Sequence, residues 1–188
     1  MKMTRLVFKS VSEIVDSAMC LIVLTDQEEA RQITIVCDSH TKYQLGLRIA
    51  GVPVAEKLLP EVLLKFMIPY VDGMEIIIHN VTDGQYNAVL RNGNTSVAAP
   101  IRISDAVLLS YISKIPLYID NELMKLQSVP YCSGKQGLSV PVNTISNDML
   151  KDALSKAIKC ENYELASQLR NEQIRRQKTD KSPKTDIE

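Results

Sequence analysis

Residues 75–103 read EIIIHNVTDGQYNAVLRNGNTSVAAPIRI. Two turn dipeptides divide this stretch, Asp83-Gly84 and Asn92-Gly93, and leave β-rich runs at 75–81, 85–91 and 95–103. Asp-Gly and Asn-Gly reach positive φ at little cost, as the two-residue turn of a β-hairpin requires. The stretch therefore predicts three adjacent antiparallel strands.

A helix is predicted directly after the third strand. Ser104-Asp105 precedes the apolar run 106–113, and Pro116 ends it. The serine hydroxyl is placed to accept a backbone N–H, and the carboxylate lies near the positive end of the helix dipole. A short strand at 117–119 and a last helix at 121–126 complete this part of the chain.

The residues before position 75 mix strands and helices in the same way. Short β-rich runs lie at 6–8, 18–24 and 32–36. Asp38 or Ser39 caps a helix that reaches about Ala50, with Tyr43, Leu47 and Ala50 on one face and Gly51 as its stop. Pro60 begins or kinks a second helix over 58–67. This order predicts an α+β fold with a mixed sheet, an antiparallel three-strand meander and packed helices.

Composition divides the chain into four parts. Residues 1–126 are dense in Val, Ile and Leu and form the predicted domain. Residues 127–148 are rich in Pro, Gly, Ser and Asn, which predicts a linker. A helical period returns over 149–178 and predicts an α-helical hairpin, followed by a polar tail at 179–188.

The composition excludes several classes of protein. The chain of 188 residues is 45% hydrophobic and carries 22 Lys and Arg against 22 Asp and Glu, so its formal net charge is zero. These fractions are typical of a globular protein and exclude a largely disordered or fibrous chain. Neutrality excludes a protein that coats nucleic acid non-specifically, because that binding needs many cationic contacts. Residues 149–188 nevertheless carry nine basic and seven acidic side chains, which makes a small basic arm.

Cysteine usage and hydropathy indicate the compartment. The four cysteines lie far apart and, with only two histidines, give no zinc-binding pattern. No apolar run approaches the roughly 20 residues that span a bilayer. Glu13 and Asp16 interrupt the region where a signal peptide would have its apolar core. We expect a cytoplasmic protein with reduced thiols and no contact with a membrane.

The helix start at 102–106 also carries a family motif. The string Ala99-Pro100-Ile101-Arg102-Ile103-Ser104-Asp105-Ala106 resembles the Arg-x-Ser-Asp-Ala motif of the bifunctional nuclease (BFN) domain family, which ends a strand and opens an apolar helix. Ile115-Pro116-Leu117-Tyr118 matches the exit from that helix, and 33–36 resembles the apolar strand upstream. The resemblance covers about residues 3–126, and it implies cleavage of DNA and RNA.

Two positions depart from the family pattern. His40 stands where the family usually has a Glu at the start of the first helix, and Val54-Ala55-Glu56-Lys57 replaces its usual Thr-His-Asp. Two polar positions of the implied site are thus replaced, and this keeps a function without catalysis open.

Arg102 and Asp105 are the first candidate catalytic residues. Hydrolysis of a phosphodiester needs an activated water and positive charge near the phosphoryl oxygens. Arg102 supplies a phosphate contact, and Asp105 supplies a base or a ligand for a divalent metal such as Mg or Mn. Ser104 is a candidate substrate contact, because the N–H groups of a helix start attract anions. The alternative is structural: Ser104 caps the helix, Asp105 favours its dipole and Arg102 pairs with Asp105.

Other polar residues are weaker candidates. His40, at a helix start, is a candidate general acid or base near pH 7, with an ordinary surface histidine as the alternative. Glu56 is a candidate substrate-binding residue and Asp38 a candidate carboxylate ligand, with a cap or a solvated charge as the alternative for each. His79 is expected to alternate with Ile76 and Ile78 in its strand and to have a structural role.

The predicted hairpin has a resemblance of its own. Residues 149–178 read MLKDALSKAIKCENYELASQLRNEQIRRQK and resemble the UVR motif of the UvrB and UvrC excision-repair proteins. In that family the hairpin pairs with another copy or with a partner protein. The candidate partner-binding residues are Tyr163, Ala166, Leu169 and Arg170. Two helices of this length cannot bury both apolar faces alone. We therefore expect a protein partner and a homo-oligomer, and a hairpin folded back on its own domain is the alternative.

Two functions follow from the sequence. The first is a nuclease that hydrolyses DNA, RNA or both, with the hairpin as a recruitment arm. The second is a catalytically silent module that keeps the BFN-like fold and binds a protein through the hairpin.

Overall fold

This computed structural model describes residues 2–13, 19–67, 71–131, 147–159 and 163–180. The chain forms two compact units, Met1–Thr82 with Tyr86–Leu138 and Asp83–Gln85 with Ser139–Glu188. No helix within the described ranges is long and apolar enough to cross a membrane.

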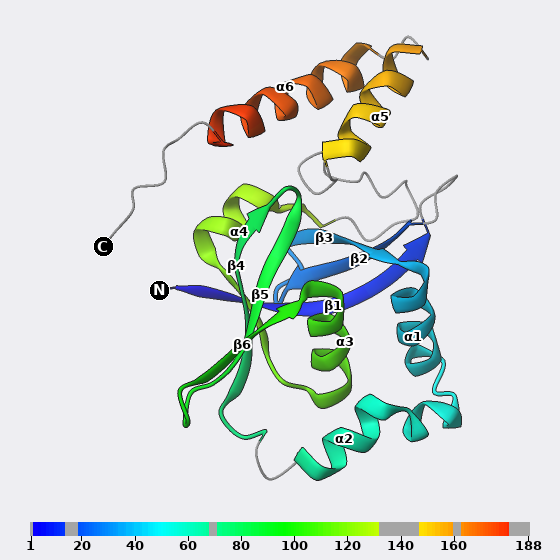
Figure 1. Ribbon diagram of the computed structural model, residues 1–188, viewed down its shortest axis with the longest axis vertical. Helices are drawn as coiled ribbons and strands as arrows, with labels where there is room; N and C mark the ends of the chain where they lie inside the picture. The colour runs from blue at the N-terminus through cyan, green and yellow to red at the C-terminus, as the bar shows by residue number, and fades with distance from the viewer. Residues whose placement is uncertain (1, 14–18, 68–70, 132–146, 160–162, 181–188) are drawn as a thin grey trace. The chain divides into compact units, whose positions relative to one another are not determined.

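The first unit is built on an eight-stranded sheet (Figure 1). Its strands are β1 (Met3–Glu13), β2 (Met19–Asp26), β3 (Arg31–Asp38), β4 (Met74–Thr82), β5 (Gln85–Asn92), β6 (Val97–Arg102), β7 (Leu117–Asp120) and β8 (Val129–Pro130). They lie in the order β6-β5-β4-β7-β1-β2-β3-β8. β4 and β7 are parallel, whereas β7, β1, β2, β3 and β8 follow one another antiparallel. The predicted mixed sheet, with β4, β5 and β6 as adjacent strands, is confirmed.

Helices connect and cover these strands. They are α1 (Ser39–Ile49), the 3-10 helix η1 (Pro53–Lys57), α2 (Leu59–Met67), α3 (Ile103–Ser113) and α4 (Asn121–Gln127). Figure 1 shows α1 and α3 lying against the sheet beside β1, β2 and β3. The core between them contains Ile22 and Leu24 of β2, Ile33 and Ile35 of β3, Leu45 of α1, and Ala106 and Val107 of α3. Burial of each large aliphatic side chain stabilises the fold by about 1.5–3 kcal/mol.

The two turn dipeptides behave differently. Asp83 and Gly84 have φ of 51° and 74° and make the predicted two-residue turn between β4 and β5. The second prediction was wrong, because Asn92 pairs with Val97 and leaves a four-residue loop. The Asn92 side chain accepts the backbone N–H of Asn94 at 2.9 Å, and Ser96 takes the positive φ of 56°. An Asx turn therefore replaces the tight hairpin here.

The first helix begins and ends as predicted, but it buries a different face. Asp38 caps α1, and Gly51 follows it with φ of 62°. The face with Tyr43, Leu47 and Ala50 was the wrong prediction: Thr41 and Leu45 are buried, and Tyr43 is 62% exposed. α1 packs against α3 and the first three strands, and tertiary packing thus overrides the local pattern.

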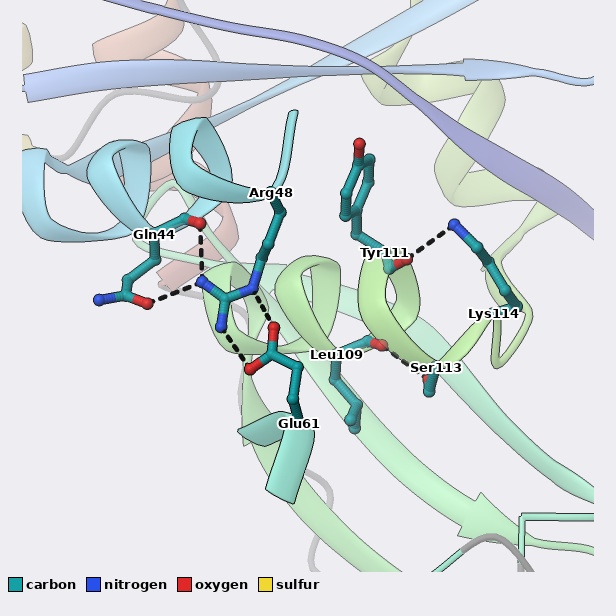
Figure 2. Close-up of polar contacts among 7 residues, drawn as sticks. All are labelled: Gln44, Arg48, Glu61, Leu109, Tyr111, Ser113 and Lys114. Carbon is teal, nitrogen blue, oxygen red and sulfur yellow. Dashed lines mark hydrogen bonds and ion pairs between the residues drawn. The ribbon is translucent and has the colours of Figure 1, made fainter. Parts of the chain in front are cut away.

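The third helix begins earlier than predicted and ends at the predicted residue, Ser113. It begins at Ile103, so Ser104 lies inside its first turn and is not the predicted cap; Arg102 holds the cap position, with no side-chain hydrogen bond to the backbone there. The helix ends at Ser113 because Lys114 turns left-handed with φ of 63°, before Pro116 is reached. The Lys114 ammonium donates to the Tyr111 carbonyl at 2.9 Å (Figure 2).

The sheet continues beyond the predicted domain boundary at residue 126. Arg31 donates to the hydroxyl and the carbonyl of Ser128 at 2.6 and 2.7 Å, and this places β8 beside β3. Both outer strands carry a proline, Pro100 in β6 and Pro130 in β8, which discourages pairing with another chain. Residues 132–146 of the predicted linker lie outside the described residues.

The second unit contains α5 (Asn147–Lys159) and α6 (Tyr163–Asp180), the two helices that the sequence predicts. Leu150 and Ala157 of α5 pack with Ala166 and Leu169 of α6, and Ala153 and Leu154 pack at the edge of this cluster. α6 runs to Asp180, two residues into the predicted tail, and residues 181–188 lie outside the described residues. The small side chains Ala157 and Ala166 allow the helices to approach closely.

A buried ion pair attaches α2 to α1. Arg48 of α1 donates from Nε and Nη2 to the two carboxylate oxygens of Glu61, both at 2.7 Å. Its Nη1 donates to the carbonyl and the side chain of Gln44 at 2.7 and 2.8 Å (Figure 2). The side chains of Arg48 and Glu61 are only 5% and 14% exposed, and α2 has no fully buried residue. The pair therefore fixes the position of α2.

Glu61→Ala should lower the free energy of unfolding by about 3–5 kcal/mol, because it leaves the Arg48 charge buried without a partner. Urea denaturation measures this, with Lys65→Ala as the matched control on an exposed position of the same helix. The double variant Arg48→Met/Glu61→Leu should recover most of the loss, since it removes both charges. Equal stability of Glu61→Ala and Lys65→Ala would contradict this role.

Candidate functional site

Arg102 lies where the edge strand β6 passes into α3. It pairs with Asn87 in the sheet and has an extended conformation, with φ of −61° and ψ of 133°, immediately before the helix. Its side chain is 56% exposed. The junction of strand and helix thus presents a guanidinium at the surface beside the start of α3.

Two aspartates hold this guanidinium. Arg102 donates from Nε and Nη2 to the two oxygens of Asp105 at 3.0 and 2.9 Å. Its Nη1 donates to Asp38 at 3.1 Å. The hydrogen bonds that Asp105 accepts, and then the one that Asp38 accepts, hold the pKa of Arg102 above its usual range, so the guanidinium stays charged. The predicted pairing of Arg102 with Asp105 is present, and Asp38 adds a second partner.

Asp38 connects this cluster to the first helix. Its other oxygen accepts the backbone N–H of Thr41 at 2.6 Å and so caps α1. That hydrogen bond, and then the contact with Arg102, lower the pKa of Asp38 from its ordinary value of 3.8. One carboxylate therefore caps α1 while it orients the side chain that precedes α3.

Part of the guanidinium remains available to a ligand. Three of the five N–H groups of an arginine are used by Asp38 and Asp105, which leaves one on Nη1 and one on Nη2. The first backbone N–H groups of α3 have no side-chain cap. Free N–H groups at a helix start attract anions, and two free guanidinium N–H groups lie beside them.

A hollow of about 310 Å³ lies beside this cluster and brings the three predicted catalytic residues together. His40, Arg102 and Asp105 line it. His40 is exposed at the second position of α1. The rest of the lining is mainly apolar: Leu58, Leu59, Pro60 and Leu108, with Thr41 and Gln44. The chemistry of the hollow is thus one guanidinium, one carboxylate, one imidazole and an aliphatic wall.

The two predicted substrate-binding residues lie elsewhere. The Ser104 side chain is only 4% exposed, because its position in the first turn points it into the core. Its backbone N–H still belongs to the uncapped turn. Glu56 lies in η1 and lines a separate hollow with Glu61, Lys65 and Asp72. The structure therefore does not bring Glu56 to Arg102.

The histidine in β4 does not follow its predicted pattern. Ile76, Ile77 and Ile78 are all buried, and His79 is exposed directly after them. The expected alternation was wrong, because this central strand is covered on both faces until the buried run ends. Three consecutive isoleucines are the signal that sequence reasoning missed.

The predicted partner-binding residues divide into two groups. Tyr163 and Arg170 are exposed on α6. Ala166 and Leu169 are buried in the contact with α5. Two of the four side chains therefore face outward from the helix pair, and two hold its helices together.

The donor groups do not fit a site for Mg or Mn. Such ions take about six oxygen ligands. Within the described residues no three His, Cys, Asp or Glu side chains lie close enough to hold a metal. Both oxygens of Asp105, and both of Asp38, already accept hydrogen bonds. We derive no step through a metal from this arrangement.

The nearby cysteines are not nucleophiles. Cys20 and Cys37 face each other across β2 and β3, and both are buried free thiols. Burial raises the pKa of Cys37 to about 12. Since the thiolate is the reactive form, these side chains serve packing.

Comparison with known families gives this arrangement a context. The model of the bifunctional nuclease domain matches residues 22–131, more than half of the chain. The chain belongs to the bifunctional nuclease domain family. Comparison with curated proteins found no match. The family resemblance predicted from the Arg-x-Ser-Asp-Ala motif is thus confirmed, and the bifunctional nuclease domain match ends before α5 begins.

The lowered pKa of Asp38 makes a prediction about stability. A carboxylate with a lowered pKa in the folded state contributes stability above its ordinary pKa, and this contribution is lost as the pH falls through the lowered value. Asp38→Asn keeps a capping side chain but removes the charge. It should be less stable than the wild type at neutral pH, by at most about 1 kcal/mol because the group is half exposed.

Urea denaturation over a series of pH values checks this expectation. The difference between wild type and Asp38→Asn should be constant above about pH 5 and vanish near pH 2. Asp72→Asn, at an exposed carboxylate, is the control. A difference that does not depend on pH would show that the charge of Asp38 contributes nothing.

Proposed function

We propose that this protein hydrolyses phosphodiester bonds in nucleic acid at the hollow beside Arg102. The observation that carries the proposal is the meeting of Arg102, His40 and the uncapped start of α3 at one hollow. The two free guanidinium N–H groups bind the phosphoryl oxygens, and the positive end of the α3 dipole favours the same charge. Family membership supports the same reaction.

The reaction needs a proton to move as well as charge to be stabilised. Water adds to phosphorus, the bond from phosphorus to one nucleoside oxygen breaks, and that oxygen gains a proton. His40 is the imidazole that lines the hollow, and it serves as the general acid or base, the role that histidine takes most often in enzymes. Asp105 and Asp38 act through Arg102, because their oxygens are occupied by its guanidinium and by the N–H of Thr41.

The charge of the cluster sets a limit on its affinity. One guanidinium and two carboxylates give a local net charge of −1. Binding of a phosphate therefore relies on directed N–H groups rather than on excess positive charge, in agreement with the neutral composition of the chain. We expect modest affinity, with specificity from the geometry of the guanidinium.

Purified protein should cleave end-labelled single-stranded DNA or RNA, or their duplexes. Assays with EDTA, Mg²⁺ and Mn²⁺ show whether an added ion contributes. His40→Ala should reduce the rate by about 10²–10⁴, the usual loss when a general acid or base is removed. Arg102→Ala and Asp105→Ala should reduce it as well, the latter because the guanidinium loses its orientation.

Glu122→Ala, on the exposed surface of α4, is the control and should leave the rate unchanged. Intact substrates under every condition, or equal rates for all four variants, would contradict catalysis at this hollow.

A catalytically silent interaction module is the second candidate. One observation favours it: the contacts of Arg102 with Asp38 and Asp105 join the ends of β3 and β6 to α1 and α3, and this alone explains all three residues. The replaced polar positions at His40 and Glu56 point in the same direction. In this case the BFN-like fold has no catalytic role, and α5 and α6 bind the partner protein.

We also propose that α5 and α6 form a UVR-like hairpin that binds a partner protein. Its two helices share one small cluster, in which Leu150 and Leu169 are the large buried side chains. Tyr163, Ile158 and Ile174 are exposed on the same pair of helices. Exposed apolar side chains on a small helix pair are typical of a binding surface, and Arg170 adds a cation to it.

Self-association has a separate basis, in α2. Val62, Leu63, Phe66 and Met67 are all exposed, with Phe66 at 76%. Their spacing of three and four residues puts them on one side of the helix, away from Glu61. We propose that a second copy of the chain covers this apolar face and that the protein is a homo-oligomer.

Deletion of residues 149–178 separates these two interactions. The shortened chain should lose proteins that the full chain captures in a pull-down, because the hairpin is absent. Its mass by light scattering should still correspond to more than one copy, because α2 is intact. Unchanged capture would contradict hairpin binding, and a monomeric full chain would contradict the homo-oligomer.

A further inference from the structure

A second hollow shares Arg102 with the first. It has a volume of about 450 Å³ and is formed on the meander of β4, β5 and β6. His79, Asn87, Ala88, Pro100, Ile101 and Arg102 line it. Arg102 is thus common to both hollows, and each is within the range of about 300–1,000 Å³ that is usual for small-ligand sites.

The polar groups of the second hollow are placed by the sheet. His79 is exposed where the buried run of β4 ends. Asn87 is opposite Arg102 in the pairing of β5 with β6. Its Nδ2 donates to the side chains of Asn80 and Thr82 at 2.5 and 3.0 Å, and these bonds fix its rotamer. No described residue makes a hydrogen bond or an ion pair with the His79 imidazole.

The two hollows differ in their chemistry. The first, with Leu58, Leu59, Pro60 and Leu108, offers an aliphatic wall to the flat face of a base. The second offers an imidazole and an amide, which form hydrogen bonds with a sugar or the edge of a base. Because Arg102 lines both hollows, a phosphate on Arg102 would lie beside each of them. A strand that crosses this point would therefore place one nucleoside on each side of the phosphate.

We propose that the second hollow is a nucleoside subsite, with His79 as its main contact, for the unpaired strand whose phosphate binds Arg102. This inference rests on the proposed hydrolysis of nucleic acid and adds its substrate class. A duplex presents its backbone outward and keeps its bases stacked inside, so only an unpaired strand fills both hollows. His79 is a binding residue here and takes no part in the bond cleavage.

Substrates with a nucleoside on only one side of the phosphate test this directly. Thymidine 5′-(p-nitrophenyl phosphate) and thymidine 3′-(p-nitrophenyl phosphate) are two such compounds, and bis(p-nitrophenyl) phosphate has none. His79→Ala should lower kcat/KM for one of the two thymidine compounds by about three- to tenfold, the effect of one hydrogen bond, mainly through KM. The other compound and bis(p-nitrophenyl) phosphate should be unaffected.

Two further variants sharpen the result. His79→Gln keeps a hydrogen-bond donor and should restore most of the affinity. Thr95→Ala, in the exposed loop between β5 and β6, is the matched control and should behave as wild type. Equal rates for wild type and His79→Ala on all three compounds would overturn the subsite, as would an equal loss on all three.

Binding of a fluorescent single-stranded oligonucleotide separates this outcome from failure of the proposed function. If wild type binds the strand but cleaves nothing, hydrolysis is wrong and the subsite is judged by affinity, which His79→Ala should weaken by about three- to tenfold. Tighter binding of the matching duplex, or unchanged affinity of His79→Ala, would overturn the subsite. Absence of any binding by wild type would overturn both.

Discussion

The guanidinium of Arg102, held between Asp38 and Asp105, is the interaction on which the functional region depends. It joins two places where the chain changes from strand to helix, the end of β3 and the end of β6. Because Asp38 also caps α1, a displacement of Arg102 would disturb the first turns of both α1 and α3. The same contact brings the uncapped turn of α3 to the hollow that contains His40.

Under the proposed function, structural and chemical roles coincide in these residues. A half-exposed ion pair contributes little stability, about 0–1 kcal/mol, so cohesion alone is a weak reason for a bidentate contact and a third hydrogen bond on one side chain. A fixed orientation of the Arg102 guanidinium is a better reason for these contacts. The two carboxylates leave two N–H groups in a defined orientation at the surface, and a phosphate needs this arrangement. The pair of Arg48 and Glu61, by contrast, is buried, with the Arg48 side chain only 5% exposed, and it serves to attach α2.

Local sequence signals predicted most of the fold. The Asp83-Gly84 turn, the cap at Asp38 and the apolar strands depend on a few neighbouring residues, and they were predicted correctly. One error was local, and two arose where distant contacts decide. Asn92 captures a backbone N–H and lengthens its turn, β8 exists only through β3, and Thr41 rather than Tyr43 is buried because α3 lies against that side of α1.

The motif residues of the site were predictable from the sequence, but the full set of residues that line it was not. Arg102, Asp105 and His40 carried enough local signal to be named, and they line one hollow. Glu56 was named with them, yet η1 directs it to another hollow, which no local pattern reveals. His79 was expected to alternate with Ile76 and Ile78 and to have a structural role, and only the structure shows that it lines a hollow with Arg102.

The most direct test of the central claim is a crystal structure with an uncleaved phosphorothioate dinucleotide bound. The account predicts that the phosphorothioate accepts hydrogen bonds from Nη1 and Nη2 of Arg102, with Asp38 and Asp105 still in contact with the guanidinium. One nucleoside should lie beside His40 and the other beside His79. A dinucleotide bound elsewhere, with Arg102 in contact only with its two aspartates, would contradict the account.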